Sequence, residues 1–507
     1  MPGKIYFLLI PLLVTSCSIF NPIPQPKREF RGFWVATVVN IDWPKSGKDT
    51  LEKQKEDYLN ILDFYKDLSF NAAIVQVRAA GDAFYESRHA PWSRFLSGQE
   101  GKAPGTDILE WMIEETHKRG MEFHAWLNPY RATFDLNTEI LSPTHDYYLH
   151  PEWMIRYGKK YYYNPGLPQV RKHLVSLMEE LVTKYEIDAI HFDDYFYPYK
   201  VPGEVFNDSL SYASNHLGNQ SLEDWRRSNV DSLIKNVHRS IKSKKPWIQF
   251  GVSPFGVWKN KSTDPRGSDT KAGQTTYEDL YADPLLWMEK GWIDYLVPQV
   301  YWSMELPVAS HSKIVDWWSR NTQNSNLYIG NGAYKIRNNS DEAWNRKKEL
   351  PDQLSLARKN DVVAGNVLFS AKSLMQNNLD VVDYLKKKYY ALDALTPISP
   401  WANLPPKTEI PIISTNSGRG TLRINLSNSK AYPFLLCYAS GKKADSEYPI
   451  KKLLARIYVG TKNQIEIDKE LVKGRKHIAL TFLDRFGRES EPIVIHLDQT
   501  DRDDSKR

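Results

Sequence analysis

The chain has 507 residues, of which 41% are hydrophobic and 25% are charged, a globular composition that excludes a disordered or collagen-like protein. Its 67 Lys and Arg residues exceed its 61 Asp and Glu residues by 67 − 61 = 6. No basic run concentrates this excess, so nucleic-acid binding is not expected.

Two cysteines, Cys17 and Cys437, exclude a disulfide framework and a multi-cysteine zinc site. Aromatic residues make up 13% of the chain, which suits a surface that stacks on sugar rings and also suits a large core.

The first residues have the pattern of a bacterial secretion signal. Lys4 precedes an apolar run from Ile5 to Val14, which is shorter than the ~20 residues that a membrane-spanning helix needs. The run ends in Val14-Thr15-Ser16-Cys17, which resembles a lipobox. We therefore expect a lipoprotein signal over residues 1–17, a Pro-rich tether over residues 18–28, and a lipid anchor at Cys17. This pattern predicts a cell-envelope lipoprotein, in the outer membrane of a Gram-negative bacterium, and an ordinary cleavable signal is the alternative.

Residues 29–398 alternate short apolar, β-branched runs with amphipathic helical stretches. Eight such units predict an α/β fold, a (β/α)8 barrel of the TIM type, with a doubly wound open sheet as the alternative. The expected strands span residues 32–39, 72–77, 122–128, 188–195, 248–254, 294–301, 327–332 and 364–369.

The connections that follow the expected strands are long, and those that precede them are short. Insertions therefore collect at the carboxyl ends of the strands, where barrel enzymes build their sites. Many aromatic residues fall in these insertions, which favours a carbohydrate-lined cleft over a purely structural role. The long connections span residues 78–105, 129–168, 196–220 and 255–277.

A Pro-rich linker over residues 399–407 precedes a region with another hydrophobic period. Leu422, Ile424 and Leu426 alternate with polar residues, so residues 408–497 are expected to form a β-sandwich resembling fibronectin type III, as a spacer or binding module. Cys437 is expected to be a buried thiol there, and residues 498–507 a charged tail. The Pro-rich linker predicts few contacts between barrel and sandwich, unless Trp401 docks.

The sharpest motif is Phe192-Asp193-Asp194-Tyr195, at the end of the fourth expected strand. Strand alternation predicts that His191, Asp193 and Tyr195 point into the barrel mouth and that Asp194 lies on the opposite face. Carboxylates at a barrel mouth are costly unless they are paired or used. We therefore expect a catalytic role for at least one of Asp193 and Asp194, and a structural pair is the alternative.

Polar and aromatic side chains also stand near the ends of the other strands, and their convergence indicates a binding site. The expected substrate-binding residues are Arg31, Trp34, Gln76, Arg78, Trp126, Asn128, His191, Tyr195, Gln299, Tyr301, Trp302 and Asn331.

In four motifs the chain resembles glycosyl hydrolase-like family 10, a family of bacterial barrels that are often lipoproteins. The motifs are Arg31-Gly32-Phe33-Trp34-Val35, Trp126-Leu127-Asn128-Pro129, the segment 192–198 and the segment 291–302. The resemblance spans roughly residues 28–390 and implies a barrel that hydrolyses a polysaccharide. One characterised branch of the family hydrolyses peptidoglycan glycan strands stripped of their peptides, which makes such strands the implied substrate.

The fourth strand also resembles the Asp-x-x-Asp-x-Asp-x-Glu signature of family 18 chitinases, with Asp188, His191, Asp193 and Tyr195 at the marked positions. Because Tyr195 stands where that family keeps its acid, the substrate-assisted route does not carry over. A two-carboxylate mechanism then needs a second acid or base from a loop. The first candidate is Glu305, followed by Asp82, Glu86 and Asp42.

Three functions stay open at this level. The leading one is a membrane-anchored glycoside hydrolase, in which an Asp of strand four is the nucleophile or charge stabiliser and a loop carboxylate is the general acid. A non-catalytic glycan-binding lipoprotein is the second, and a deacetylase with a metal at His191 and Asp193 is the third. The sequence contains no Walker loop, dinucleotide glycine pattern, HExxH or G-x-S-x-G elbow, so no cofactor is expected.

Overall fold

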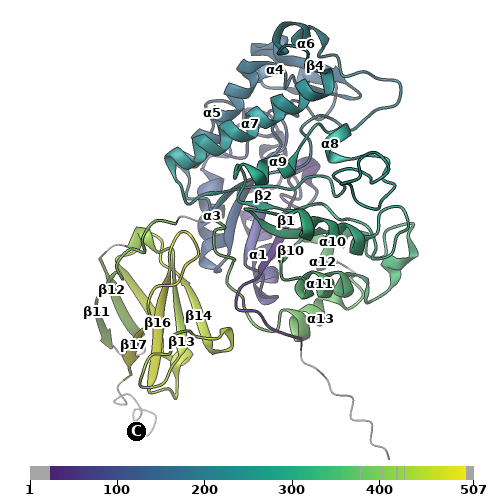
Figure 1. Cartoon of the computed structure of the whole chain (residues 1–507). Helices are drawn as coiled ribbons and strands as arrows, with labels where there is room; N and C mark the ends of the chain where they lie inside the picture. The colour runs from purple at the N-terminus through teal and green to yellow at the C-terminus, as the bar shows by residue number, and fades with distance from the viewer. Residues whose placement is uncertain (1–22, 377, 402–403, 418–420, 428, 498–507) are drawn as a thin grey trace, which may run out of the picture.

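The computed structural model describes residues 23–376, 378–401, 404–417, 421–427 and 429–497 (Figure 1). The expected lipobox with Cys17 and the charged tail over residues 498–507 lie outside these ranges.

Eight parallel strands close a barrel in the order β1-β10-β9-β8-β7-β6-β3-β2. This closure confirms the barrel and contradicts the open-sheet alternative. The barrel strands are β1 (Phe30–Val35), β2 (Ala72–Arg78), β3 (Glu122–Leu127), β6 (Ala189–Phe192), β7 (Gln249–Val252), β8 (Tyr295–Leu296), β9 (Asn326–Asn331) and β10 (Val363–Leu368).

All eight strands lie within or overlap their expected ranges, but four of them end two to five residues early, and one of these is β1, which stops at Val35. β6 stops at Phe192, β7 at Val252, and β8 contains only Tyr295 and Leu296. The expected ranges continue past these points in the sequence, whereas ladder pairing depends on where the neighbouring strand diverges. The motif at the end of β6 therefore lies in irregular backbone.

Helices cover the outside of the barrel. The N-cap residues Thr50, Asp107, Ser221 and Ser310 each accept a hydrogen bond from the backbone N–H three residues later, which satisfies a free donor of the first helical turn. The outer helices are α1 (Leu51–Asp67), α3 (Ile108–Lys118), α5 (Pro168–Lys184), α7 (Leu222–Lys244), α9 (Pro284–Glu289), α10 (His311–Asn321), α11 (Glu349–Lys359), α12 (Ala371–Met375) and α13 (Val381–Tyr384).

The long connections after β2, β3, β6 and β7 carry small elements of their own. Figure 1 shows α4, α6 and β4 gathered at the end of the molecule that is far from the C-terminal sheets. The insertions thus build up one end of the barrel, as the connection lengths predict. These elements are α2 (Arg94–Ser97), α4 (Asp146–Leu149), the hairpin β4 (Met154–Tyr157) and β5 (Lys160–Tyr163), α6 (Ser209–Asn215) and α8 (Thr276–Asp279).

The inside of the barrel is filled by aromatic side chains. Phe30 stacks on Tyr328 with ring centroids 4.1 Å apart, and Tyr295 lies against both. Gly251 makes room for one of these rings, because a Cβ at this position would lie 2.0 Å from Cζ of Tyr295. The barrel is therefore a packed core with no open channel through these layers.

The C-terminal region forms two antiparallel sheets, one of three strands in the order β11-β12-β15 and one of four in the order β14-β13-β16-β17. Leu422, Ile424 and Leu426 are buried between polar neighbours, as their period of two predicts, and Cys437 is a buried free thiol. The strands are β11 (Ile412–Ser417), β12 (Thr421–Leu426), β13 (Phe434–Ala439), β14 (Leu453–Tyr458), β15 (Gln464–Asp468), β16 (His477–Leu483) and β17 (Ile493–His496).

These sheets are in contact with the barrel, so the prediction of few contacts is wrong. The indole N–H of Trp401 donates to Oδ1 of Asp294, and the ammonium of Lys242 lies 4.1 Å from the centroid of a Trp401 ring. Arg485 pairs with Glu186 at 3.0 Å. A short Pro-rich linker can hold two domains against each other as well as apart. Here the contact between linker and barrel covers the charged side chains of Asp294 and Lys242.

The expected tether is also partly packed. Within residues 23–28, Gln25 donates to the carbonyl of Lys388 at 2.9 Å, and Lys27 pairs with Glu489 at 3.0 Å. The described part of the N-terminal segment is thus bound to both the barrel and the sheets. Among the described helices, none combines the length and apolar character that crossing a membrane requires.

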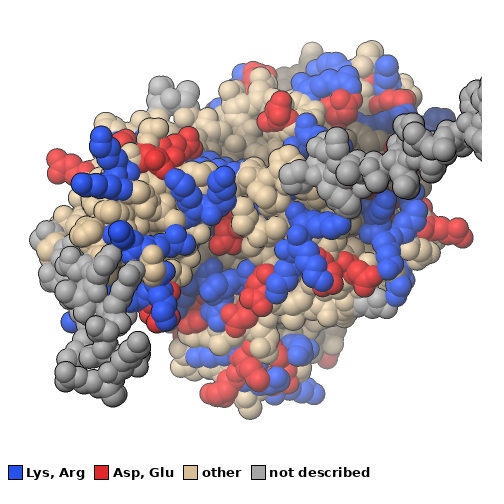
Figure 2. All heavy atoms as spheres, turned by 90° about the horizontal axis from the view of Figure 1, so that it is seen from below, with Lys and Arg blue, Asp and Glu red and all other residues tan. Residues whose placement is uncertain are grey.

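Surface charge is mixed in sign. Figure 2 shows Lys and Arg side chains interspersed with Asp and Glu side chains over both parts of the molecule on the face seen from below. On this face, therefore, charges of one sign do not gather into a single large field.

Candidate active site

A cavity of about 290 Å³ lies at the carboxyl ends of the barrel strands. Each of the eight strands, or the loop that follows it, contributes to the wall, which is the usual architecture of a barrel active site. The lining residues are Trp34, Val38, Ile41, Gln76, Trp126, Asn128, Arg131, Asp193, Asp194, Tyr195, Tyr199, Ser253, Gln299, Tyr301, Tyr334 and Phe369.

Two adjacent carboxyls, those of Asp193 and Asp194, face this cavity. They are 3% and 2% exposed, respectively. The prediction that Asp194 points to the opposite face is wrong, because β6 ends at Phe192 and alternation does not extend into the loop. Both carboxyls are therefore in position to meet one ligand.

The surroundings of the two carboxyls differ. Burial, and then the charge of Asp194, raises the pKa of Asp193, whose Oδ2 has no hydrogen-bond partner. Burial also raises the pKa of Asp194, but the Tyr199 hydroxyl donates to its Oδ2 and favours the ionised form. Of the pair, Asp193 is thus the carboxyl that holds the proton more tightly.

His191 lies beneath the cavity and does not line it, in contrast to its expected role in substrate binding. Its Nε2 accepts a hydrogen bond from the Trp34 indole at 3.3 Å and lies 3.1 Å from the Ser253 hydroxyl. Because the indole can only donate, the proton of a neutral ring sits on Nδ1, which faces the Tyr295 hydroxyl at 3.1 Å. Burial lowers the pKa of His191 and keeps it neutral. The imidazole ring of His191 therefore holds two residues of the cavity wall, Trp34 and Ser253, in place.

Several polar atoms of the wall have no protein partner. The Oε1 of Gln76 accepts from the backbone N–H groups of Thr37 and Val38, which leaves its Nε2 without a partner. The side-chain amide oxygen (Oδ1) of Asn128 and the indole N–H of Trp126 are also unpaired. Buried polar atoms without partners are costly, and a ligand rich in hydroxyl groups would satisfy them.

Nine of the predicted site residues line the cavity and are brought together by the fold. They are Trp34, Gln76, Trp126, Asn128, Asp193, Asp194, Tyr195, Gln299 and Tyr301.

Three predicted binding residues are engaged elsewhere. Arg31 donates to Glu29 at 2.7 Å near the amino end of β1. Arg78 donates to the carbonyl of Asn128 at 2.6 Å, and Asn331 accepts from Asn366 at 2.8 Å. These residues hold the backbone and the barrel interior together, so their prediction as substrate-binding groups is not supported by the cavity lining.

Two predicted residues after β8 also lie outside the wall. Trp302 packs edge-on against Phe255 with ring centroids 5.4 Å apart. Glu305, the first candidate for a second catalytic carboxylate, is exposed, and its carboxylate accepts from Ser312 at 3.4 Å. The three other candidates, Asp42, Asp82 and Glu86, are likewise absent from the lining.

The sequence interpretation missed seven lining residues. Arg131 follows β3 by four positions and Tyr199 follows Asp194 by five, so both could have been found by extending the search from the strand ends into the loops. The others are Val38, Ile41, Ser253, Tyr334 and Phe369.

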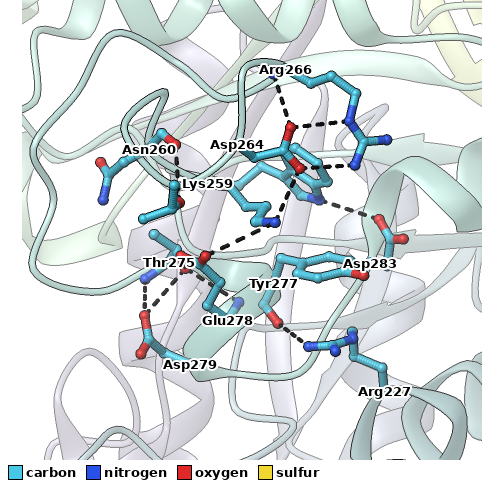
Figure 3. A network of polar contacts seen from close by, with 12 residues as sticks. Arg227, Lys259, Asn260, Asp264, Arg266, Thr275, Tyr277, Glu278, Asp279 and Asp283 are labelled. Atoms are coloured by element: carbon cyan, nitrogen blue, oxygen red, sulfur yellow. Dashed lines mark hydrogen bonds and ion pairs between the residues drawn. The ribbon is translucent and has the colours of Figure 1, made fainter. Parts of the chain in front are cut away.

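The loop after β7 is stiffened by a polar network (Figure 3). Lys259 pairs with Asp264 at 3.1 Å, and Asp264 also accepts from Arg266 at 2.9 Å. The amide oxygen of Asn260 accepts from the Thr270 hydroxyl at 2.8 Å. This insertion is therefore an ordered part of the structure, in the same loop after β7 that begins with Ser253.

A metal site finds little support in the donor set. Within the described ranges, no three His, Cys, Asp or Glu side chains are grouped so that they could hold a metal ion. The alternative of a metal held by His191 and Asp193 is not supported, because both ring nitrogens of His191 face protein hydrogen-bond partners.

Comparisons of the sequence with known proteins identify one family. The sequence profile described as "Glycosyl hydrolase-like 10" matches residues 29–346. Glycosyl hydrolase YngK of Bacillus subtilis (strain 168) is 43% identical over 452 residues, which cover 86% of this chain and 88% of that protein. Glycosyl hydrolase DigH of Escherichia coli (strain K12) is 35% identical over 389 residues, which cover 72% of this chain and 88% of that protein.

Among solved structures, the PgaB (BpsB) glycoside hydrolase domain from Bordetella bronchiseptica is similar at a TM-score of 0.47 and 11% identity. The match covers 71% of this chain and 99% of that one.

Proposed function

The chain belongs to the glycosyl hydrolase-like 10 family, and from this premise we propose that it is a glycoside hydrolase that cleaves a polysaccharide in the cavity at the strand ends. The observation that carries the proposal is the pair of buried carboxyls, Asp193 and Asp194, in a cavity with unpaired polar atoms. Hydrolysis of a glycosidic bond uses two carboxyl groups in different protonation states.

Asp193 acts as the general acid in this proposal. Its raised pKa keeps the proton on the carboxyl near neutral pH, from where it passes to the glycosidic oxygen as the bond breaks. Asp194 stays ionised with the help of the Tyr199 hydroxyl and stabilises the positive charge that develops at the anomeric carbon. A water molecule then adds to the anomeric carbon and gives up a proton to Asp193, which restores the acid. Since the lining residues include no third carboxylate, the pair takes both roles, and a loop acid such as Glu305 is not required.

Peptidoglycan glycan strands stripped of their peptides are the substrate that we propose. The aromatic wall residues Trp34, Trp126 and Tyr301 suit the apolar faces of sugar rings, and the unpaired wall atoms suit hydroxyl and amide groups. The test is release of reducing ends from a panel of peptide-free peptidoglycan strands, chitin oligomers and plant glycans.

We expect release from the peptidoglycan strands and none from Asp193→Asn on the same substrate. Binding of strands without any release would contradict hydrolysis and favour a glycan-binding protein. Absence of both binding and release across the panel would contradict the proposal as a whole.

We further propose that the protein is anchored in the bacterial envelope through a lipid on Cys17. The support is the apolar run that ends in Val14-Thr15-Ser16-Cys17. Cys17→Ala is expected to move the protein from the membrane fraction to the soluble periplasmic fraction. Unchanged partitioning of the variant would contradict the anchor.

The C-terminal sheets are proposed to form a sandwich of the fibronectin type III kind. The separation into a three-stranded sheet β11-β12-β15 and a four-stranded sheet β14-β13-β16-β17 supports this proposal. An experimental structure with another strand order would contradict it.

A further inference from the structure

We infer that Ser253 accepts a hydrogen bond from the substrate in the cavity, and that a hydrogen-bond chain through the barrel core, from His191 to Glu122, holds Ser253 in this role. The inference deepens the proposed function, on which it rests for the location of the substrate. It adds one residue that contacts the substrate and the residues that position it. It is separate from the roles of the two carboxyls.

The hydrogen-bond chain joins three barrel strands and the end of a fourth. At the cavity, the hydroxyl of Ser253, directly after β7, lies 3.1 Å from Nε2 of His191 in β6. Nδ1 of His191 lies 3.1 Å from the hydroxyl of Tyr295 in β8, and this hydroxyl lies 2.8 Å from Nδ1 of His124 in β3. Nε2 of His124 lies 3.0 Å from Oε2 of Glu122, the first residue of β3. The cavity is thus connected to the amino end of the barrel by consecutive hydrogen bonds.

The protons of this hydrogen-bond chain have one consistent arrangement. The Trp34 indole can only donate and lies 3.3 Å from Nε2 of His191, so the neutral His191 ring has its proton on Nδ1. Nδ1 then donates to the Tyr295 hydroxyl, which donates in turn to Nδ1 of His124. The proton of His124 is therefore on Nε2 and points to the carboxylate of Glu122, which can only accept. A donor at one end and an acceptor at the other impose the same direction.

Burial makes this arrangement difficult to change. His124, His191 and Tyr295 are each 0% exposed. The second carboxylate oxygen of Glu122 accepts from the Thr396 hydroxyl at 2.6 Å, which fixes the far end. Reversal of a single hydrogen bond would leave two donors or two acceptors facing each other, and buried polar groups without partners are costly.

The direction of the hydrogen-bond chain determines which kind of hydrogen bond Ser253 can form with a ligand. Because Nε2 of His191 has no proton, it can only accept from the Ser253 hydroxyl. The carbonyl of Phe192, 3.5 Å from the same hydroxyl, is also an acceptor. The hydroxyl proton therefore points into the protein, and the lone pairs of the oxygen are left for the cavity. A hydroxyl group or an amide N–H of a sugar is the complementary group.

The first experiment locates the protons without any substrate. Nitrogen NMR spectra of protein with isotope-labelled histidine are expected to show His191 protonated on Nδ1 and His124 protonated on Nε2. Tyr295→Phe removes the middle hydroxyl, so both rings are expected to become mixtures of the two neutral forms. The matched control is Tyr328→Phe, because Tyr328 lies in the same aromatic layer, with ring centroids 5.4 Å apart, and is not a link of the hydrogen-bond chain.

The signals that change in Tyr295→Phe but not in Tyr328→Phe belong to the two rings of the hydrogen-bond chain. A His191 ring that is protonated on Nε2 in the wild-type protein would overturn the inference. Identical spectra of wild-type protein and Tyr295→Phe would overturn it as well.

The second experiment measures the contact between Ser253 and the substrate. Ser253→Ala removes the acceptor, and we expect its KM for peptide-free peptidoglycan strands to rise roughly 3- to 10-fold with little change in kcat. Tyr295→Phe is expected to raise KM by a smaller factor. Because Tyr295 acts through Ser253, the two effects should not multiply in the double variant, whereas Tyr328→Phe should combine with Ser253→Ala as an independent change.

Binding measurements separate this inference from hydrolysis. If no strand is cleaved, the Kd of peptide-free strands, chitin oligomers and plant glycans is measured by calorimetry for wild-type protein and Ser253→Ala. Weaker binding by the variant supports the inference even where hydrolysis fails. Cleavage with an unchanged KM in Ser253→Ala would overturn the inference and leave the proposed function intact. Equal Kd values, absence of binding across the panel, or effects of Ser253→Ala and Tyr295→Phe that multiply would also overturn it.

Discussion

At the amino end of β6, Asp188 accepts hydrogen bonds from the His117 ring and from the backbone N–H of Phe123, both at 2.7 Å, whereas Oδ2 of Asp193 at the carboxyl end has no partner. Burial by itself raises the pKa of both carboxyls. At Asp188 the His117 charge and the hydrogen bonds outweigh burial and lower the pKa, while at Asp193 the pKa stays raised. A satisfied carboxylate and an unsatisfied one thus lie only five positions apart in the same chain segment.

The same contrast holds for other strands. Asp294, just before β8, accepts from Lys242 at 2.7 Å, from the backbone N–H of Phe250 at 2.6 Å and from the Trp401 indole. Glu29, just before β1, pairs with Arg31 and Arg358. At the amino end of the barrel these charges are paired, and this end is in contact with the C-terminal sheets, whereas several polar groups at the carboxyl end have no protein partner.

The largest expected effect follows from removing the acid at the carboxyl end. Asp193→Asn keeps the shape of the side chain but cannot donate a proton, so we expect glycan hydrolysis to fall by ~10²–10⁴-fold. The melting temperature should stay the same or rise, because a costly buried carboxyl is replaced by a neutral amide. Parallel turnover and melting measurements check both. Full turnover in this variant together with a loss in Asp194→Asn would transfer the acid role to Asp194.

A change at the amino end should have the opposite pattern. Asp294→Ala leaves the largely buried Lys242 without its partner, and we expect a loss of about 3–5 kcal/mol in the free energy of unfolding. Turnover per folded molecule should stay at the wild-type level, because Asp294 is at the far end of the barrel strands. Urea unfolding and an active-fraction assay check this prediction. Unaltered stability would show that the charge pairs of this end contribute little.

A smaller loss is expected at the contact between linker and barrel. Trp401→Phe removes the indole N–H that donates to Asp294 and keeps an aromatic ring near Lys242. Because hydrogen bonds to charged groups contribute about 1.5–3 kcal/mol, we expect a loss at the lower end of this range. Denaturant unfolding measures it, and Trp247→Phe is the control, since the Trp247 indole N–H has no partner.

A further prediction concerns the pH dependence of stability and not its value at one pH. Asp193 has a native pKa above its unfolded value, so the stability linked to its proton is complete below the unfolded pKa of about 3.9 and is lost as the pH rises toward the native pKa. Asn cannot ionise, so the advantage of Asp193→Asn should grow between about pH 4 and pH 7, by at most about 1.4 kcal/mol per pH unit. Melting curves of both proteins across this range check the sign. A constant difference would mean that the native pKa of Asp193 is not raised.

Much of the fold could be predicted from local patterns. The apolar runs at residues 72–77 and 122–128 become β2 and β3 nearly residue for residue, because burial on both faces demands continuous apolar strands. The alternation at Leu422, Ile424 and Leu426 likewise predicted a strand with one buried face. The location of the Asp193–Asp194 pair at the end of an expected strand indicated the site, because carboxylates are rare in such places without a use.

By itself, the sequence determined the eight-unit barrel, the alternating C-terminal strands, the family and the two carboxyls of its site. Only the tertiary structure decided that β6 ends at Phe192, so that Asp193 and Asp194 both face the cavity. It also decided that Glu305 does not line the cavity and that Arg131, from the loop after β3, does. The physical reason is that apolar period is a property of neighbouring residues, whereas the end of a strand and the destination of a loop side chain depend on partners that are distant in the chain.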